Sequence, residues 1–178
     1  MAEKIVAEGV EEHLGERMLS VRPLGGGCIG EVYRAELEEG TPLVAKVDRE
    51  GESHLEREAY MLRYLRQKSE LPVPKVYHGS EKLLLMQFIE GSSRFTEGAE
   101  RNAAELLAAL HNITSATYGH ERDTLIGSLS QPNPPTESWR SSSGSTDCCT
   151  WRMSPTRRGV YRRRTCFGWS GWRRSWTN

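Results

Sequence analysis

A glycine-rich stretch and a lysine that follows it are the residues of this sequence whose types and spacing could do chemistry. Gly25-Gly26-Gly27-Cys28-Ile29-Gly30-Glu31-Val32 has the spacing G-x-G-x-x-G-x-V, and Val44-Ala45-Lys46 comes shortly after it. Because glycine has no Cβ, backbone N–H groups in such a loop can approach the oxygens of a polyanion closely. A lysine on a later strand adds a full positive charge. Together they predict a phosphate-binding site.

The residues after the glycines distinguish between the folds that use such a loop. A dinucleotide-binding fold begins a helix here, and a Walker A loop continues with Gly-Lys-Ser/Thr. Glu31–Leu37 instead has aromatic and aliphatic residues at every second position from Tyr33, which favours a strand with one buried face. A turn at residues 38–40 and a strand over residues 41–47 that carries Lys46 complete the strand–glycine loop–strand–turn–strand pattern that covers the nucleotide in kinases. A β-hairpin with a flexible glycine turn is the plain structural alternative.

Hydrophobic periodicity predicts further elements around this loop. Helices are expected over residues 3 to about 16, 51–67 and 97 to about 112, and strands over residues 18–24, 75–77 and 82–88. In the second helix, Ser53 is the expected N-cap, and Glu56 completes a capping box. A turn is expected at His78-Gly79-Ser80. The expected buried faces are Leu55, Ala59, Leu62 and Leu65 in the second helix, and Ala103, Leu106, Leu107 and Leu110 in the third.

Two further features could complete a nucleotide site. Glu58 lies beside the buried stripe of its helix, where its carboxylate could pair with Lys46 and hold the ammonium toward phosphate. A solvated helix glutamate is an equally good interpretation. The run Met86-Gln87-Phe88-Ile89 leaves a strand toward a loop, as a kinase hinge does, although a buried edge strand would look the same. His111 is expected to be structural, and the sequence indicates no metal-ligand cluster.

Length and composition limit the class of protein. The 178 residues suffice for one ordinary domain, whereas a complete two-lobed kinase needs more chain. The longest apolar run, at residues 83–86, is far too short to cross a membrane. Charged residues near the N-terminus and the lack of a signal-peptide apolar region predict a cytoplasmic protein. Four cysteines, two of them adjacent, do not make a disulfide framework.

Several of these segments together resemble the fructosamine kinase (ketosamine-3-kinase) family. The resemblance rests on residues 25–30 with their cysteine, 43–47, 55–62, 72–77, 83–91 and 103–111, and on a characteristic stretch with Tyr118-Gly119, Asp123, Ile126-Gly127-Ser128-Leu129, Gln131-Pro132-Asn133 and Trp139. It covers about residues 1–139. It implies an α+β, protein-kinase-like fold related to the aminoglycoside and choline kinases. The N-terminal lobe would hold a five-stranded antiparallel sheet and a helix.

The resemblance also implies an activity, which is ATP-dependent phosphorylation of the sugar 3-hydroxyl of ketosamines. ATP and Mg²⁺ would be the cofactors, and ketosamine small molecules or glycated protein amines would be the substrates. In this scheme the glycines cover the phosphates, Lys46 contacts them and Glu58 orients Lys46. Gln87 and Ile89 would offer backbone groups to adenine. The residues expected to bind nucleotide are Gly25, Gly26, Gly27, Cys28, Ile29, Gly30, Val32, Lys46, Glu58, Met86, Gln87, Phe88 and Ile89.

Cys28 has two interpretations. Backbone N–H groups around a phosphate loop create positive potential, which favours the thiolate, and the thiolate is the form that oxidises. The plain alternative is a small apolar filler under the loop. In the family that this chain resembles, a cysteine at this position is implicated in redox-sensitive, disulfide-linked dimers. We therefore expect Cys28 to form an intermolecular disulfide, and so a disulfide-linked homodimer, under oxidising conditions.

The sequence departs from the family where catalysis would take place. The family's H-G-D loop, with an asparagine a few residues later, and its following metal-binding aspartate do not occur in the 178 residues. After Trp139 the only acidic residue is Asp147. No group is then expected to accept the hydroxyl proton, and none to hold Mg²⁺. The chain is predicted to contain no catalytic residue and to be a poor enzyme or none.

The composition changes after Trp139. Residues 1–139 carry 15 basic and 23 acidic side chains, whereas residues 140–178 carry nine arginines and Asp147 alone. Such a tail could bind nucleic acid or a membrane surface. A frameshift accounts for it better, because restoring one G after the Trp139 codon in a consistent back-translation gives the family-like start W-A-E-F-F-R-E without a stop codon. We expect a non-native, disordered tail and neither nucleic acid nor membrane as a partner.

The predicted organisation has three parts. Residues 1–91 would form the N-terminal lobe with the glycine-rich loop and hinge, residues 92–139 the beginning of the C-terminal lobe, and residues 140–178 the non-native tail. Two alternative functions stay open at this point. One is a small-molecule phosphotransferase of the aminoglycoside or choline kinase type, and the other is a non-catalytic nucleotide-binding or scaffold protein.

Overall fold

A computed structural model of the chain describes residues 1–25, 31–48, 54–91, 94, 96–127 and 129–138. The elements are α1 (Ala2–Leu14), β1 (Met18–Pro23), β2 (Glu31–Leu37), β3 (Leu43–Val47), α2 (Leu55–Lys68), β4 (Val76–Gly79), β5 (Leu83–Gln87), α3 (Glu97–His111), β6 (Thr124–Ile126) and β7 (Leu129–Gln131). Five strands form one antiparallel sheet in the order β1-β2-β3-β5-β4, and β6 pairs with β7 alone. The predicted α+β class and the five-stranded sheet are confirmed.

The register of the central strands divides their side chains between the two faces of the sheet. Lys46 of β3 lies opposite Val32 of β2 and Leu84 of β5. Ala45, one residue earlier, lies opposite Leu85 of β5. Directly opposed residues point to the same face, and neighbours along a strand point to opposite faces. One face therefore carries Lys46, and the other carries Ala45.

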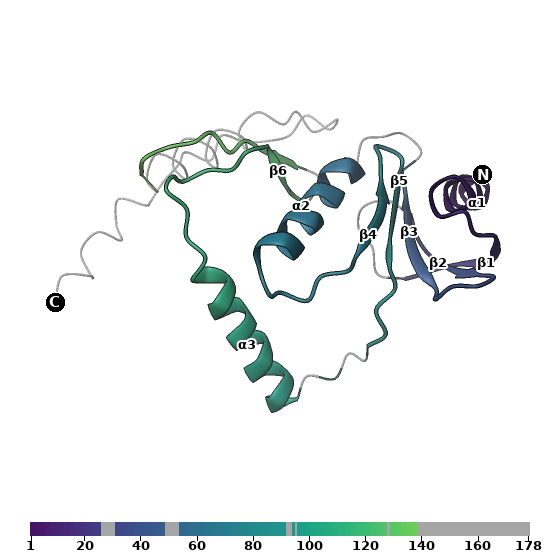
Figure 1. The fold of residues 1–178 in the computed structure, drawn as a ribbon, viewed down its shortest axis with the longest axis horizontal. Helices are drawn as coiled ribbons and strands as arrows, with labels where there is room; N and C mark the ends of the chain where they lie inside the picture. The colour runs from purple at the N-terminus through teal and green to yellow at the C-terminus, as the bar shows by residue number, and fades with distance from the viewer. Residues whose placement is uncertain (26–30, 49–53, 92–93, 95, 128, 139–178) are drawn as a thin grey trace, which may run out of the picture.

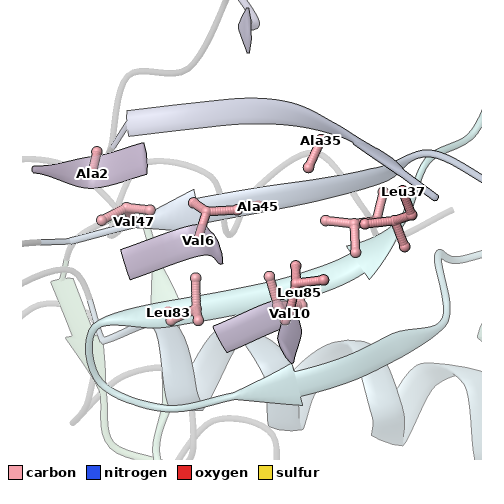
Figure 2. Close-up of a cluster of buried hydrophobic side chains, with 10 residues drawn as sticks. Ala2, Val6, Val10, Ala35, Leu37, Ala45, Val47, Leu83 and Leu85 are labelled. Carbon is pink, nitrogen blue, oxygen red and sulfur yellow. The ribbon is translucent and has the colours of Figure 1, made fainter. Parts of the chain in front are cut away.

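Helix α1 covers the face that carries Ala45 (Figure 1). Figure 2 shows the aliphatic side chains of α1 directed at those of the sheet. Gly9 lets the helix approach closely, because a Cβ there would overlap the side chain of Leu83. The helix ends at Gly15, whose φ of 69° makes it a left-handed C-cap. The buried core between α1 and the sheet consists of Ala2, Val6, Val10, Ala35, Leu37, Leu43, Ala45, Val47, Leu83 and Leu85.

Helix α2 packs on the face that carries Lys46, through Leu55 and Ala59 against Leu84. The predicted capping box is wrong. The N-cap is His54 in a left-handed conformation, with φ 55° and no side-chain cap, while Ser53 lies outside the described residues. The His54 carbonyl accepts the N–H groups of Arg57 and Glu58 at 2.9 and 3.2 Å, so the helix begins at Leu55.

The turn expected at residues 78–80 is also displaced. His78 and Gly79 belong to β4, and the chain turns between Ser80 and Leu83, where the Ser80 N–H donates to the Leu83 carbonyl at 2.8 Å. Gly79 serves close packing instead of a turn, because a Cβ there would overlap the Cβ of Ala59. Strand β3 begins at Leu43, two residues later than predicted.

Helix α3 has the predicted bounds but not the predicted burial. It begins with Thr96, whose hydroxyl accepts the Ala99 N–H at 3.2 Å. It buries none of its residues, Ala103 is exposed, and Leu107 is 49% exposed. Figure 1 shows α3 running away from the sheet. An amphipathic pattern predicts a face that needs a partner, and the described residues do not bury this one.

We expect Gly79→Ala to lower the free energy of unfolding by about 1–3 kcal/mol, because the added methyl must push α2 off the sheet. Gly91→Ala is the matched control, since a Cβ there meets nothing within 4 Å. Its effect should stay within about 0.5 kcal/mol. Denaturant unfolding of the three proteins measures both changes, and equal effects of the two substitutions would contradict the packing assigned to Gly79.

His13 of α1 and His78 of β4 stack, with ring centroids 3.5 Å apart and an interplanar angle of 7°. Desolvation lowers the pKa of His78 below the ordinary 6.5; His13 and then Arg63 lower it further, and Glu12 opposes them. The folded state therefore binds a proton at His78 less readily than the unfolded state does. The contribution of neutral His78 to the free energy of unfolding should therefore be fully present above pH 6.5. It should be lost as the pH falls through the lower pKa of the folded state.

Replacing His78 with Gln should remove part of this pH dependence. The thermal midpoint of the unsubstituted protein should fall relative to that of His78→Gln as the pH is lowered from about 8 to about 5. His111→Gln, at the exposed end of α3, should keep the original pH dependence. Parallel curves for all three proteins would show that His78 does not titrate differently on folding.

Candidate functional site

An ion pair joins β3 to α2 on the sheet face that carries Lys46. Lys46 Nζ donates to Glu58 Oε2 at 2.6 Å and to Oε1 at 2.9 Å. The two side chains are 15% and 32% exposed. The pairing that the position of Glu58 beside the buried stripe of its helix allowed is therefore present, and Glu58 is not the solvated helix glutamate of the alternative interpretation.

The surroundings of the pair orient the ammonium. Val32 and Leu84 flank Lys46 on the neighbouring strands, so apolar side chains limit the access of water. Charge-assisted hydrogen bonds are stronger where water competes less. An ammonium has three N–H donors, and the two bonds to Glu58 leave donor capacity for an anion. The pair can therefore hold a positive charge in a fixed place and still bind phosphate.

The glycine-rich stretch connects β1 to β2, and its described ends lie at the end of the sheet that carries Lys46. The Leu24 N–H donates to the Val32 carbonyl at 2.8 Å, which closes the base of the connection. Val32 lies opposite Lys46, so the connection leaves the sheet at the end where the lysine lies. At Gly25 an added Cβ would meet nothing within 4 Å. Residues 26–30, which include Cys28 and Ile29, lie outside the described residues, and with them the predictions for the loop and its thiol.

The predicted hinge, residues 86–89, consists of the last two residues of β5 and the two residues that follow the strand. Met86 packs against the cluster of Leu55, Ala59 and Leu84 under α2. The Gln87 N–H already donates to the Lys75 carbonyl at 2.8 Å, so that donor is used within the sheet. Ile89 comes after the strand and is 55% exposed. Of the backbone groups of Gln87, only the carbonyl could therefore serve a ligand.

Arg34 lies on the same sheet face as Lys46, but the sequence analysis did not name it as a candidate site residue. Its guanidinium lies 4.3 Å from the centroid of the Phe88 ring. Its Nε is 2.8 Å from Glu36 Oε1, an ionic contact whose angle is not that of a hydrogen bond. Arg34 is two residues from Val32 on β2, so strand alternation places both on the face of Lys46. The two-residue spacing of Val32 and Arg34 on a predicted strand was the signal in the sequence that could have placed Arg34 on the face of Lys46.

The described residues do not fit a magnesium site. Among them, no group of three or more His, Cys, Asp and Glu could hold a metal ion. Asp48 is 9% exposed, and Asp123 accepts the Asn133 N–H at 3.4 Å. Magnesium in kinases is bound by carboxylates together with substrate phosphates, and neither aspartate lies in such a cluster. In the described part of the chain, no helix is long and apolar enough to span a membrane.

Comparison with known proteins decides the family. The fructosamine kinase family model matches residues 1–142. The chain belongs to the fructosamine kinase family. A candidate ketoamine kinase from Synechocystis is 28% identical over 141 residues, which cover 75% of this chain and 48% of that protein.

Solved structures share the fold of this family member. A candidate fructosamine-3-kinase from Thermobifida fusca matches with a TM-score of 0.65 and 29% identity, covering 79% of this chain and 50% of that one. Another from Haemophilus somnus matches with a TM-score of 0.66 and 24% identity, covering 78% and 49%. The predicted resemblance and the kinase-like fold are confirmed. The chain spans about half the length of these relatives.

Proposed function

We propose that residues 1–91 form the nucleotide-binding lobe of an ATP-dependent ketosamine kinase and that residues 92–139 begin its C-terminal lobe. The observation that carries this proposal is the Lys46–Glu58 pair, which lies opposite Val32 at the end of β2 that the glycine-rich connection enters. In kinases this pair holds the lysine against the nucleotide phosphates. Family membership supports the assignment independently.

ATP fits the residues around the pair. Val32 and Met86 are apolar, half-buried and on the sheet face of Lys46, as the walls of an adenine pocket require. Lys46 would contact the phosphates, and residues 25–30 would cover them with backbone N–H groups. The Gln87 carbonyl and the Ile89 backbone would meet the adenine edge. ATP supplies the phosphoryl group when it is bound.

The substrate is proposed from the relatives. Those relatives are described as ketoamine and fructosamine-3-kinases, which supports a ketosamine, either small or attached to protein, as the acceptor. A substrate of the aminoglycoside or choline type stays the second candidate within the same fold. The cytoplasmic location and the Cys28-linked homodimer continue as predictions from the sequence.

Binding and turnover are separable in this chain. Phosphoryl transfer needs a group that takes the proton of the attacking hydroxyl and residues that hold Mg²⁺. The sequence contains neither the H-G-D loop nor the later aspartate of the family. We therefore propose that the chain binds nucleotide and turns over ketosamine poorly or not at all.

Lys46→Ala should weaken ATP binding by roughly 10- to 100-fold, because a charge-assisted hydrogen bond to phosphate is worth about 1.5–3 kcal/mol. Lys82→Ala is the matched control, since Lys82 is exposed at the turn before β5. Its affinity should match that of the unsubstituted chain. Calorimetric titration with ATP measures all three proteins, and equal affinity for Lys46→Ala and the unsubstituted chain would refute the role of Lys46.

The 178-residue chain should show no ketosamine-dependent ATP consumption above background. A chain whose frame is restored after Trp139 and continued through the family's catalytic loop should consume ATP with ketosamine, and Lys46→Ala should abolish that activity. Turnover by the 178-residue chain that depends on Lys46 would mean that a proton acceptor exists elsewhere. ATP binding without turnover by either chain would favour the non-catalytic alternative.

A further inference from the structure

A second segment of the chain lies against α2, on the side away from the sheet (Figure 1). It consists of residues 118–127 and 129–136, with the β6–β7 hairpin at its centre, and we call it the brace. The sequence analysis singled out this stretch as characteristic of the family but assigned it no role. Its residues are 56 to 73 positions away from those that they contact on α2.

Polar and aromatic contacts join the brace to α2. Arg57 Nη1 donates to Ser130 Oγ at 2.6 Å, and the Tyr60 hydroxyl lies 3.1 Å from His120 Nε2. The His120 ring also meets the Tyr64 ring edge to face, with centroids 4.4 Å apart. The three α2 residues follow one another at intervals of three and four, so they lie along one stripe of the helix.

The opposite stripe of α2 faces the sheet. Leu55 and Ala59 are the only residues of the helix that are fully buried, and they pack against Leu84. Glu58 projects from the helix between the two stripes and reaches Lys46. A rotation or a lift of the helix from the sheet would carry the Glu58 carboxylate away from the ammonium. The brace closes the helix in from the other side.

The brace is itself cross-linked. The Asn133 side-chain amide donates to the Arg122 carbonyl at 3.1 Å and to Thr124 Oγ1 at 2.8 Å. The Tyr118 and Thr136 backbones exchange hydrogen bonds of 2.9 and 2.8 Å. At Gly119, φ is 108° and an added Cβ would lie 2.5 Å from the Pro134 carbonyl oxygen, so this position requires glycine. The family-like residues of the stretch therefore make it a stiff support.

We propose that the brace is a positioning element for the nucleotide site, which holds α2 so that Glu58 orients Lys46. This inference rests on the proposed function, because it assigns the brace to the same site. Arg57, Tyr60 and His120 are positioning residues, since none of them makes a hydrogen bond to the ion pair. We expect their effect on nucleotide to pass through Glu58.

A double-mutant cycle tests this coupling without nucleotide. The full chain, His120→Ala, Glu58→Gln and the double variant are unfolded in denaturant. Sites that act independently change the unfolding free energy additively, whereas coupled sites do not. We expect His120→Ala to lower the unfolding midpoint less in the Glu58→Gln background than alone. His111→Ala, the matched histidine at the exposed end of α3, should be additive with Glu58→Gln.

A second measurement uses ADP as the probe. His120→Ala should weaken ADP binding about tenfold in the unsubstituted background and leave it unchanged in Glu58→Gln, where the carboxylate is already lost. Ser130→Ala, which removes only a hydroxyl from the brace, repeats the test if His120→Ala does not fold. Additive effects in the unfolding cycle, or equal weakening of ADP in both backgrounds, would overturn the proposal. Failure of the unsubstituted chain to bind ADP would refute the nucleotide site, while the unfolding cycle still decides the coupling.

Discussion

The Lys46–Glu58 ion pair requires helix α2 to stay close to the sheet, and the packing of the described residues keeps it there. An ammonium that is largely withdrawn from water is tolerated only beside a carboxylate. The lysine comes from a strand and the carboxylate from a helix, so the pair exists only while α2 stays close to the sheet. Ala59 and Gly79 permit that approach because neither presents a large side chain at the contact. The packing of two small residues is thus a condition for the electrostatics of the site.

Much of this arrangement could be predicted from the sequence. Strand β2 has the bounds that its alternation indicated, and the five-stranded sheet is the one that the resemblance to a kinase-like family implied. The pairing of Glu58 stayed open because a helix position gives a direction but not a distance, and the register of β3 against β2 and β5 supplied the rest. Gly79 was misassigned to a turn. A glycine can serve a turn or a close contact, and only the position of Ala59 distinguishes the two.

The contacts of α2 with the brace could not be predicted from spacing. Arg57 and Ser130 are 73 residues apart, and nothing local in either segment indicates the other. Resemblance marked the stretch around Gly119 and Asn133 without a physical reason for it. The structure supplies that reason as hydrogen bonds within the segment and a left-handed glycine. The burial predicted for α3 failed for a related cause, since amphipathicity shows which face needs cover and not which segment supplies it.

The described residues contribute binding geometry, and the chemistry of phosphoryl transfer requires other groups. Lys46 can offer a fixed positive charge to a phosphate, but an ammonium held by Glu58 is a proton donor and cannot accept the proton of a hydroxyl. Glu58 is bonded to the lysine through both oxygens, so it cannot act as that base without releasing the charge that the proposed phosphate contact needs. Neither Lys46 nor Glu58 is therefore available to accept the proton of the attacking hydroxyl. Under the proposed function, such a site would position the nucleotide and would depend on a separate carboxylate for phosphoryl transfer.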